Sequence, residues 1–125
     1  MYKRILVAAD ATPLSKKAVA HAIGLAASTG AELVVLTVTQ RYPVSYMEGA
    51  VAFEAIDVAK IEKQWTEQGR ALVDRYVQQA EAKGVLARAA VAKSDLVAES
   101  IIAAAAKHKV DLIVMASHGR KGIKR

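Results

Sequence analysis

Residues 111–122 read Asp-Leu-Ile-Val-Met-Ala-Ser-His-Gly-Arg-Lys-Gly. The apolar run 112–116 has the length of a buried strand, and it breaks into a turn of small residues that contains Gly119 and leads into two bases. A parallel sheet presents such a loop to a phosphorylated ligand, because main-chain N–H groups at small residues are open to phosphate oxygens. The segment therefore predicts a parallel sheet with a nucleotide-type site at one strand end.

Three further apolar runs lie upstream of this segment. Residues 3–9, 33–38 and 85–92 are rich in Ile, Leu, Val and Ala, which is typical of strands buried on both faces. Arg88 interrupts the third run, so this strand is expected near an edge of the sheet.

Helical patterns separate these strands. Apolar spacing predicts helices over about 15–28 and 51–83, which end at Gly30 and Gly84. A third predicted helix is capped by Ser94 and Asp95 and runs to about His108. Residues 39–50, with Pro43 and Gly49, are expected to be irregular. The long second helix has one apolar stripe, on which Gly69 indicates close packing or a bend. The stripe consists of Val58, Ile61, Trp65, Leu72, Tyr76 and Ala80.

The element order is βαβαβαβ, which predicts an α/β fold: a three-layer, doubly wound parallel sheet with right-handed crossovers. If the chain winds outward from the first strand to the second and third and then crosses back, the first and fourth strands become neighbours. The strand order is then 3-2-1-4. Neither a linker nor an internal repeat divides the chain, so residues 1–125 are expected to form one domain.

Composition excludes several classes of protein. The 125 residues contain no cysteine, so disulfides and thiolate metal sites are absent, which fits a cytoplasmic protein. The apolar run after Lys3 and Arg4 meets Asp10 too early for a signal peptide, and no apolar stretch approaches the roughly 20 residues that span a membrane.

The net charge of +6 is concentrated at one end of the chain. Residues 120–125 contain four bases and no acid, which leaves +2 on residues 1–119. Bases beside a glycine turn serve the phosphates of a small ligand as well as those of DNA, so the charge does not indicate nucleic-acid binding.

Ligands of doubly wound sheets bind at the carboxyl ends of strands, where the winding reverses. The first strand ends in Ala8-Ala9-Asp10-Ala11-Thr12-Pro13, and the fourth ends in Met115-Ala116-Ser117-His118-Gly119. If these strands are neighbours, Asp10 and the Ser-His-Gly turn flank one crevice. Asp10 then accepts hydrogen bonds from a ribose or holds a hydrated Mg²⁺.

Simpler interpretations stay open for these residues. Asp10 also fits the cap of the first helix, and His21 and His108 fit surface or helix-end positions. Ser117 and His118 are adjacent on a turn and do not form a nucleophile–base pair. The sequence contains neither a P-loop nor a G-x-G-x-x-G after the first strand, and no cluster of His, Asp and Glu has metal-ligand spacing.

Residues 2–10, 33–38 and 111–122 together resemble the universal stress protein family, and the similarity extends over essentially the whole chain. The resemblance implies strand order 3-2-1-4-5, a cytoplasmic location and a homodimer. The family has members that bind ATP and members that do not. The ATP-binding members share a G-x-x-G motif followed, after a fixed spacer, by G-[ST]. Here Ala116 replaces the first glycine, Gly119 matches the second, and the G-[ST] half falls beyond Arg125.

The resemblance implies a role for each end of the ligand. Asp10 meets the ribose or adenine region, the Val38 backbone meets the adenine, and Gly119 with its neighbours faces ribose and phosphate. The missing G-[ST] half cradles the phosphates in ATP-binding members, and Arg120 and Lys121 are expected to compensate for part of it. The implied ligand-contacting residues are Ala9, Asp10, Ala11, Val38, Met115, Ala116, His118, Gly119 and Arg120.

The function implied is regulatory: a stress-response protein that binds ATP with Mg²⁺, or AMP or ADP, and hydrolyses ATP slowly at most. The alternative is a non-nucleotide member that acts as a dimeric, phosphorylatable interaction module. Compared with the family, this chain is shortened before the last helix and the fifth strand. The fourth strand is therefore expected to form an open edge of the sheet.

Overall fold

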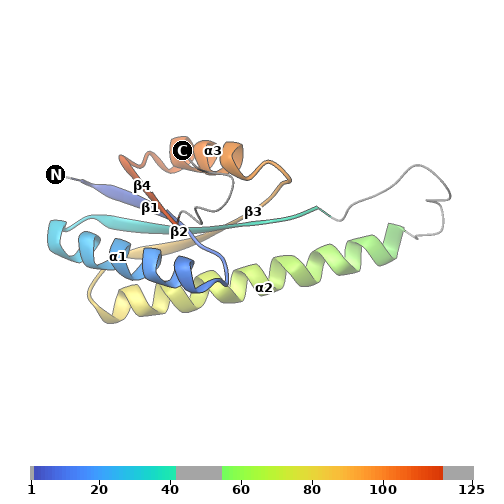
Figure 1. Cartoon of the computed structure of the whole chain (residues 1–125), viewed down its shortest axis with the longest axis horizontal. Coiled ribbons are helices and arrows are strands. Elements are labelled where there is room, and N and C mark those ends of the chain that lie inside the picture. The colour runs from blue at the N-terminus through green and yellow to red at the C-terminus, as the bar shows by residue number, and fades with distance from the viewer. Residues whose placement is uncertain (1, 42–54, 117–125) are drawn as a thin grey trace.

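The computed structural model describes residues 2–41 and 55–116, which form an α/β domain with a parallel sheet (Figure 1). The elements are β1 (Arg4–Ala8), α1 (Pro13–Thr29), β2 (Glu32–Thr39), α2 (Ala55–Ala82), β3 (Ala87–Lys93), α3 (Val97–His108) and β4 (Leu112–Met115). The strand order is β3-β2-β1-β4 and all three pairings are parallel, which confirms the predicted topology.

The sheet lies between two helical layers, with α1 and α2 on one face and α3 on the other (Figure 1). Successive strand residues point to opposite faces, so β1 supplies Ile5 and Val7 to the first layer and Leu6 to the second. Ile5, Leu6 and Val7 are fully buried, as expected for the central strand of a doubly wound sheet. Most of the core lies under α1 and α2, where Val19, Ile23, Val73 and Tyr76 cover the strands.

The first helix begins earlier than predicted. Thr12 is its N-cap and Pro13 occupies the first turn, where the missing N–H of proline costs nothing, so α1 starts at residue 13 and not at 15. Gly30 ends the helix with φ +76°, as predicted, and its N–H bonds to the Ala26 carbonyl.

The predicted cap of α3 is wrong. Leu96 occupies the N-cap position and makes no side-chain cap bond. The Ser94 hydroxyl instead accepts from the Leu96 N–H at 3.0 Å, and the Asp95 carboxylate accepts from the Arg41 N–H at 3.2 Å. β3 continues to Lys93, so Ser94 and Asp95 are used in the turn that follows the strand.

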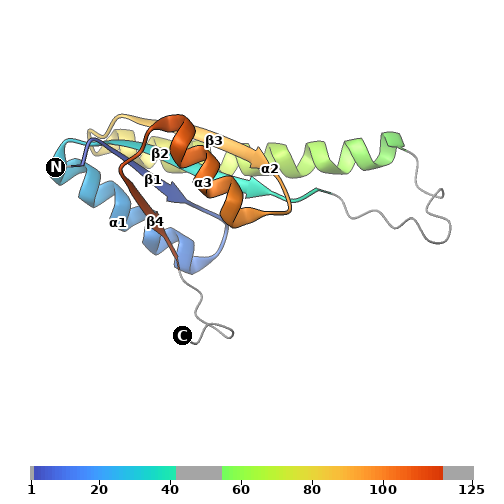
Figure 2. The same cartoon turned by 90° about the horizontal axis from the view of Figure 1, so that it is seen from above.

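The second helix projects beyond the sheet. Its 28 residues extend over about 42 Å, whereas the eight residues of β2 extend over about 26 Å. Figure 2 shows the first turns of α2 lying past the ends of the strands. On the predicted stripe Tyr76 and Ala80 are buried, while the apolar residues nearer the start of the helix are half-buried. Residues 51–54, predicted as helix, and 42–50, predicted as irregular, lie outside the described residues.

Among the described residues the edges of the sheet are β3 and β4. Arg88 and Lys93 are exposed on β3, which confirms its place at an edge. Near the start of β4, the Asp111 carboxylate accepts from the N–H groups of Lys3 at 2.9 Å and Arg4 at 3.2 Å. These bonds fix the start of β4 to the start of β1.

Gly69 is buried against β2. A Cβ at this position meets the Cγ2 atoms of Thr37 and Thr39 at 3.0 Å, so both threonines must shift by a few tenths of an ångström to admit a methyl group. We expect Gly69→Ala to lower the free energy of unfolding by about 1 kcal/mol, because overpacking outweighs the gain in helix propensity. Gly24→Ala is the matched control, since its Cβ meets no atom within 4 Å and should raise stability by about 1 kcal/mol. Urea unfolding measures whether the free energy of unfolding falls in Gly69→Ala and rises in Gly24→Ala. A stabilised Gly69→Ala contradicts the packing argument.

The pKa of Asp111 lies below the ordinary value for a carboxyl group, because the N–H groups of Lys3 and Arg4 bond to the charged form. A depressed pKa stabilises the folded state above the unfolded-state pKa of about 4, and this contribution disappears as the pH falls through the folded-state pKa. We expect Asp111→Asn to lower the thermal midpoint at pH 7 and to match the wild type near pH 2. Asp74→Asn, at an exposed position on α2, is the control. A constant difference between Asp111→Asn and the wild type from pH 7 to pH 2 contradicts this account.

Candidate functional site

A cavity of about 250 Å³ lies where β1, β2 and β4 end and α3 begins. It forms there because the order β2-β1-β4 brings three carboxyl ends together, which is the usual ligand position in this class of sheet. Its walls are mainly apolar, with one carboxylate and one hydroxyl. The lining residues are Ala8, Ala9, Asp10, Ser15, Leu36, Val38, Val97, Ile101, Met115 and Ala116.

The loop after β1 is held by a small network of hydrogen bonds. The Asp10 Oδ1 atom accepts from the Thr12 N–H at 2.8 Å and from the Thr12 hydroxyl at 2.6 Å. The buried Ser15 hydroxyl accepts from the Asp10 N–H at 2.7 Å, and the Thr12 hydroxyl accepts from the Ser15 N–H at 3.2 Å. The helix cap is therefore Thr12 and not Asp10, which supports the cap from outside the helix.

This network leaves part of Asp10 available to a ligand. Both described side-chain bonds of the carboxylate use Oδ1, and Oδ2 accepts none from the described residues. The side chain is exposed and lines the cavity. The site therefore presents a fixed, charged acceptor beside apolar walls.

The backbone of Val38 is a second polar feature of the site. Peptide groups of a parallel strand alternate between its two neighbours. The Leu36 carbonyl accepts from Ala9 on the β1 side, whereas the Thr39 carbonyl accepts from Ser94 on the β3 side. The N–H and C=O of Val38 accordingly face the β1 side, where β1 has already ended and pairs no residue with Val38. A donor and an acceptor are thus side by side at the cavity.

Five of the predicted site residues line this cavity: Ala9, Asp10, Val38, Met115 and Ala116. Ala11 does not, because it lines a separate cavity between α1 and α2. His118, Gly119 and Arg120 lie outside the described residues. The structure therefore brings the ends of β1, β2 and β4 together but leaves the glycine turn undescribed.

Sequence reasoning missed five lining residues. Leu36 lies two residues before Val38 on the same strand, and Ala8 pairs with Leu36, so all three side chains point to the α3 face. The alternation of side chains along a strand could therefore have predicted Leu36 and Ala8 as lining residues. Val97 is exposed near the mouth although it begins a helix. The other two missed residues are Ser15 and Ile101, both buried.

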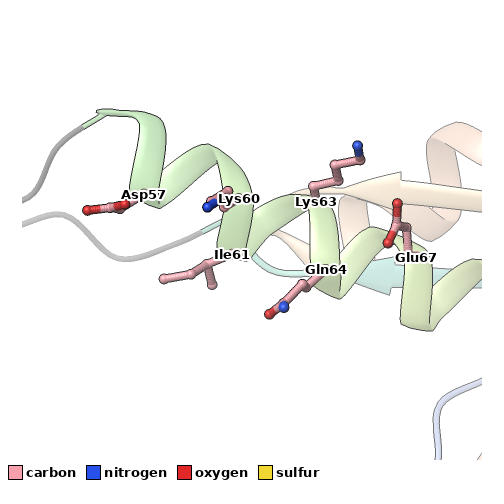
Figure 3. A pocket seen from close by; sticks show the side chains of 6 residues that line it. All are labelled: Asp57, Lys60, Ile61, Lys63, Gln64 and Glu67. Atoms are coloured by element: carbon pink, nitrogen blue, oxygen red, sulfur yellow. The ribbon is translucent and has the colours of Figure 1, made fainter.

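A larger hollow, of about 560 Å³, lies along the projecting part of α2. Figure 3 shows its side chains along successive turns of one helix: Asp57, Lys60, Ile61, Lys63, Gln64 and Glu67. No second described element contributes a wall. Side chains of mixed charge on one helix face water and do not converge on a ligand, so this hollow is not the candidate site.

The described residues contain no group of three or more His, Asp or Glu side chains suited to a metal ion. His21 is exposed on α1, and His108 ends α3, as predicted. Burial, and then the charges of Lys107, Arg88 and Arg4, lower the pKa of His108. Among the described helices, none is long and apolar enough to cross a membrane.

The fold and the site define a doubly wound α/β domain with a small ligand cavity at its strand ends, and comparison with known proteins identifies its family. A model of the universal stress protein family matches residues 1–125. Universal stress protein MJ0531 of Methanocaldococcus jannaschii is 28% identical over 125 residues, which are 100% of this chain and 70% of that protein. The chain belongs to the universal stress protein family.

Solved structures agree with this assignment. A universal stress protein family member from Burkholderia pseudomallei has 26% identity and a TM-score of 0.76, covering 94% of this chain and 83% of that one. An Arabidopsis thaliana member with AMP bound has 17% identity and a TM-score of 0.67, with 98% and 81% covered. A universal stress protein in complex with cAMP has 19% identity and a TM-score of 0.60, with 90% and 70% covered. At these identities the last two show the fold alone.

The cap residue offers a test of the loop network. We expect Thr12→Ala to lower the free energy of unfolding by about 1 kcal/mol, because the first turn of α1 loses its acceptor and Asp10 loses one of its two donors. Thr12→Ser keeps the hydroxyl and should retain most of the stability. Urea unfolding of the two variants decides the matter, and equal losses would show that the methyl group, not the hydroxyl, is what the loop needs.

Proposed function

We propose that this universal stress protein binds an adenine nucleotide in the cavity at the ends of β1, β2 and β4 and acts as a regulatory protein. One observation carries the proposal: the slot combines apolar walls with the backbone groups of Val38 and the Oδ2 atom of Asp10, none of which is bonded to a described residue. A base joined to a sugar with hydroxyl groups matches this combination of features.

Adenine fits the inner part of the slot. Its flat ring requires apolar walls, which Leu36, Ile101 and Val97 provide. Its exocyclic amino group donates and its ring nitrogens accept hydrogen bonds. The Val38 C=O and N–H supply the complementary acceptor and donor, and a backbone pair of this kind recognises the polar edge of the base without a side chain.

The ribose fits the outer part. Asp10 Oδ2 accepts from a ribose hydroxyl, the same chemistry by which a carboxylate fixes the ribose in dinucleotide-binding sheets. The bonds from Thr12 to Oδ1 fix the carboxylate before the ligand arrives, so little side-chain entropy is lost on binding.

The phosphate end of the ligand rests on the resemblance, which assigns it to Gly119 and its neighbours. AMP is the simplest ligand that tests the part of the site described here, and the AMP and cAMP complexes of distant relatives support a nucleoside monophosphate. ATP with Mg²⁺ stays a prediction. Asp10 is the one carboxylate among the described residues that line the cavity.

The alternative function, a dimeric interaction module without a nucleotide, predicts that the cavity binds no AMP. The homodimer and the cytoplasmic location stay predictions of the resemblance. Titration with AMP separates the two functions.

Calorimetric titration with AMP and with adenosine tests the proposal. We expect the wild type to bind both, Asp10→Asn to bind AMP about tenfold more weakly through loss of a charge-assisted hydrogen bond, and Ala116→Leu to lose binding because the larger side chain fills the slot. Ala106→Leu, at an exposed position of α3, is the control and should bind normally. Absence of binding by the wild type, or full-affinity binding by Ala116→Leu, rejects this site.

A further inference from the structure

A second cavity, of about 250 Å³, lies on the other side of the loop after β1. It lies between the start of α1 and α2, two helices that share the sheet face opposite α3 (Figure 1). Its lining residues are Ala11, Lys16, Leu72, Arg75, Tyr76 and Gln79. Neither the family resemblance nor the proposed nucleotide site uses this cavity, apart from the backbone segment that contains Ala11.

The lining carries donors and no acid. Lys16, Arg75, Tyr76 and Gln79 all present N–H or O–H groups, and none of the six lining residues has a carboxylate. Neither Lys16 nor Arg75 forms an ion pair with any residue in the described ranges 2–41 and 55–116. Two cations on different helices therefore border one hollow, and neither is ion-paired with a described residue.

Tyr76 gives the independent indication of a ligand. It is 5% exposed, yet its hydroxyl makes no hydrogen bond to any residue that the structure describes. Tyr76 and Arg75 line the same cavity. Burial raises the pKa of Tyr76, the charge of Asp10 raises it further and that of Arg75 lowers it. A buried hydroxyl without a partner is costly, and an acceptor in the cavity removes that cost.

The start of α1 favours the same kind of ligand. Its first turn contains no acid, and Lys16 lies close to the positive end of the helix dipole, where a cation is unfavourable. Asp10 is the nearby carboxylate, and its charge opposes an incoming anion. Two cations and the helix terminus outweigh this single negative charge.

We propose that the cavity between α1 and α2 binds a tetrahedral oxyanion, either free phosphate or the phosphoryl group of a small organic molecule. Lys16 and Arg75 neutralise its charge, and the Tyr76 hydroxyl and the Gln79 amide donate to its oxygens. This site is distinct from the nucleotide cavity and does not depend on it.

The experiment is a titration of the ¹⁵N-labelled chain with inorganic phosphate and, separately, with ribose 5-phosphate, at constant ionic strength set with chloride. We expect saturable shifts of the Ala11, Lys16 and Tyr76 amide signals. The Lys16→Gln/Arg75→Gln variant should bind at least tenfold more weakly, whereas Lys17→Gln/Arg70→Gln, with the same change in charge at positions outside the cavity, should bind as the wild type does. Tighter binding of ribose 5-phosphate identifies an organic ligand as the source of the phosphoryl group, and equal binding identifies free phosphate.

Tyr76→Phe separates binding from folding. It should melt at the same temperature as the wild type or higher in phosphate-free buffer, and should bind phosphate several-fold more weakly. A lower melting temperature for Tyr76→Phe overturns the proposal, because it shows that the hydroxyl already has a structural partner. Shifts that do not saturate, or equal losses in the two double variants, also overturn it.

Asp10→Asn distinguishes this site from the nucleotide site. Removal of its charge should strengthen phosphate binding, while the same change should weaken AMP binding. Phosphate binding weakened in parallel with AMP binding shows one shared site and overturns the proposal. If the wild type binds phosphate but no AMP, the proposed nucleotide function fails and the oxyanion site stands.

Discussion

The position of β1 between β2 and β4 is the constraint on which the rest of the structure depends. All five of its residues pair with β2 and four of them also pair with β4, and Ile5, Leu6 and Val7 are fully buried. No other described strand is flanked by neighbours reached through helices on opposite faces of the sheet. The register sets Ala8 beside Leu36 and Met115, so β1 and β4 end together while β2 continues to Thr39. The loop that leaves β1 must therefore open between the two helical layers.

This loop separates two different environments. Toward α3 it borders an apolar slot with an acceptor, and toward α2 it borders a hollow lined by donors. The difference follows from the elements on either side: α3 contributes Val97 and Ile101, whereas α1 and α2 contribute Lys16, Arg75 and Tyr76. One loop of small residues thus serves two faces of the molecule with opposite chemistry.

The continuous apolar runs were sufficient to predict all four strands, because a strand buried on both faces shows little alternation. Their order required the assumption of outward winding and the family resemblance. Burial of Ser15 was not predictable, since a serine in a helical pattern indicates a solvent-facing position, and its bond to the Asp10 N–H depends on the return of the loop. The prediction of the α3 cap was wrong for a related reason. The Ser94 hydroxyl accepts from the Leu96 N–H within its own turn, and local bonds of this kind compete with helix capping. Gly69 was predictable as a packing position because it interrupted an apolar stripe.

The hydrogen bonds of the loop do not explain why residue 10 is a charged aspartate. The two bonds from Thr12 need an oxygen acceptor at Oδ1, which the neutral amide of an asparagine also supplies. The nearby helix N-terminus favours a negative charge by only about 0.3–1 kcal/mol at an exposed position. A hydrogen bond from a ligand hydroxyl to a carboxylate contributes about 1.5–3 kcal/mol. The same charge disfavours an anion beside Tyr76. An asparagine at position 10 would therefore stabilise the loop as well as the aspartate does. The carboxylate is therefore consistent with the proposal that a ligand hydroxyl, such as that of a ribose, donates to Asp10 from the cavity.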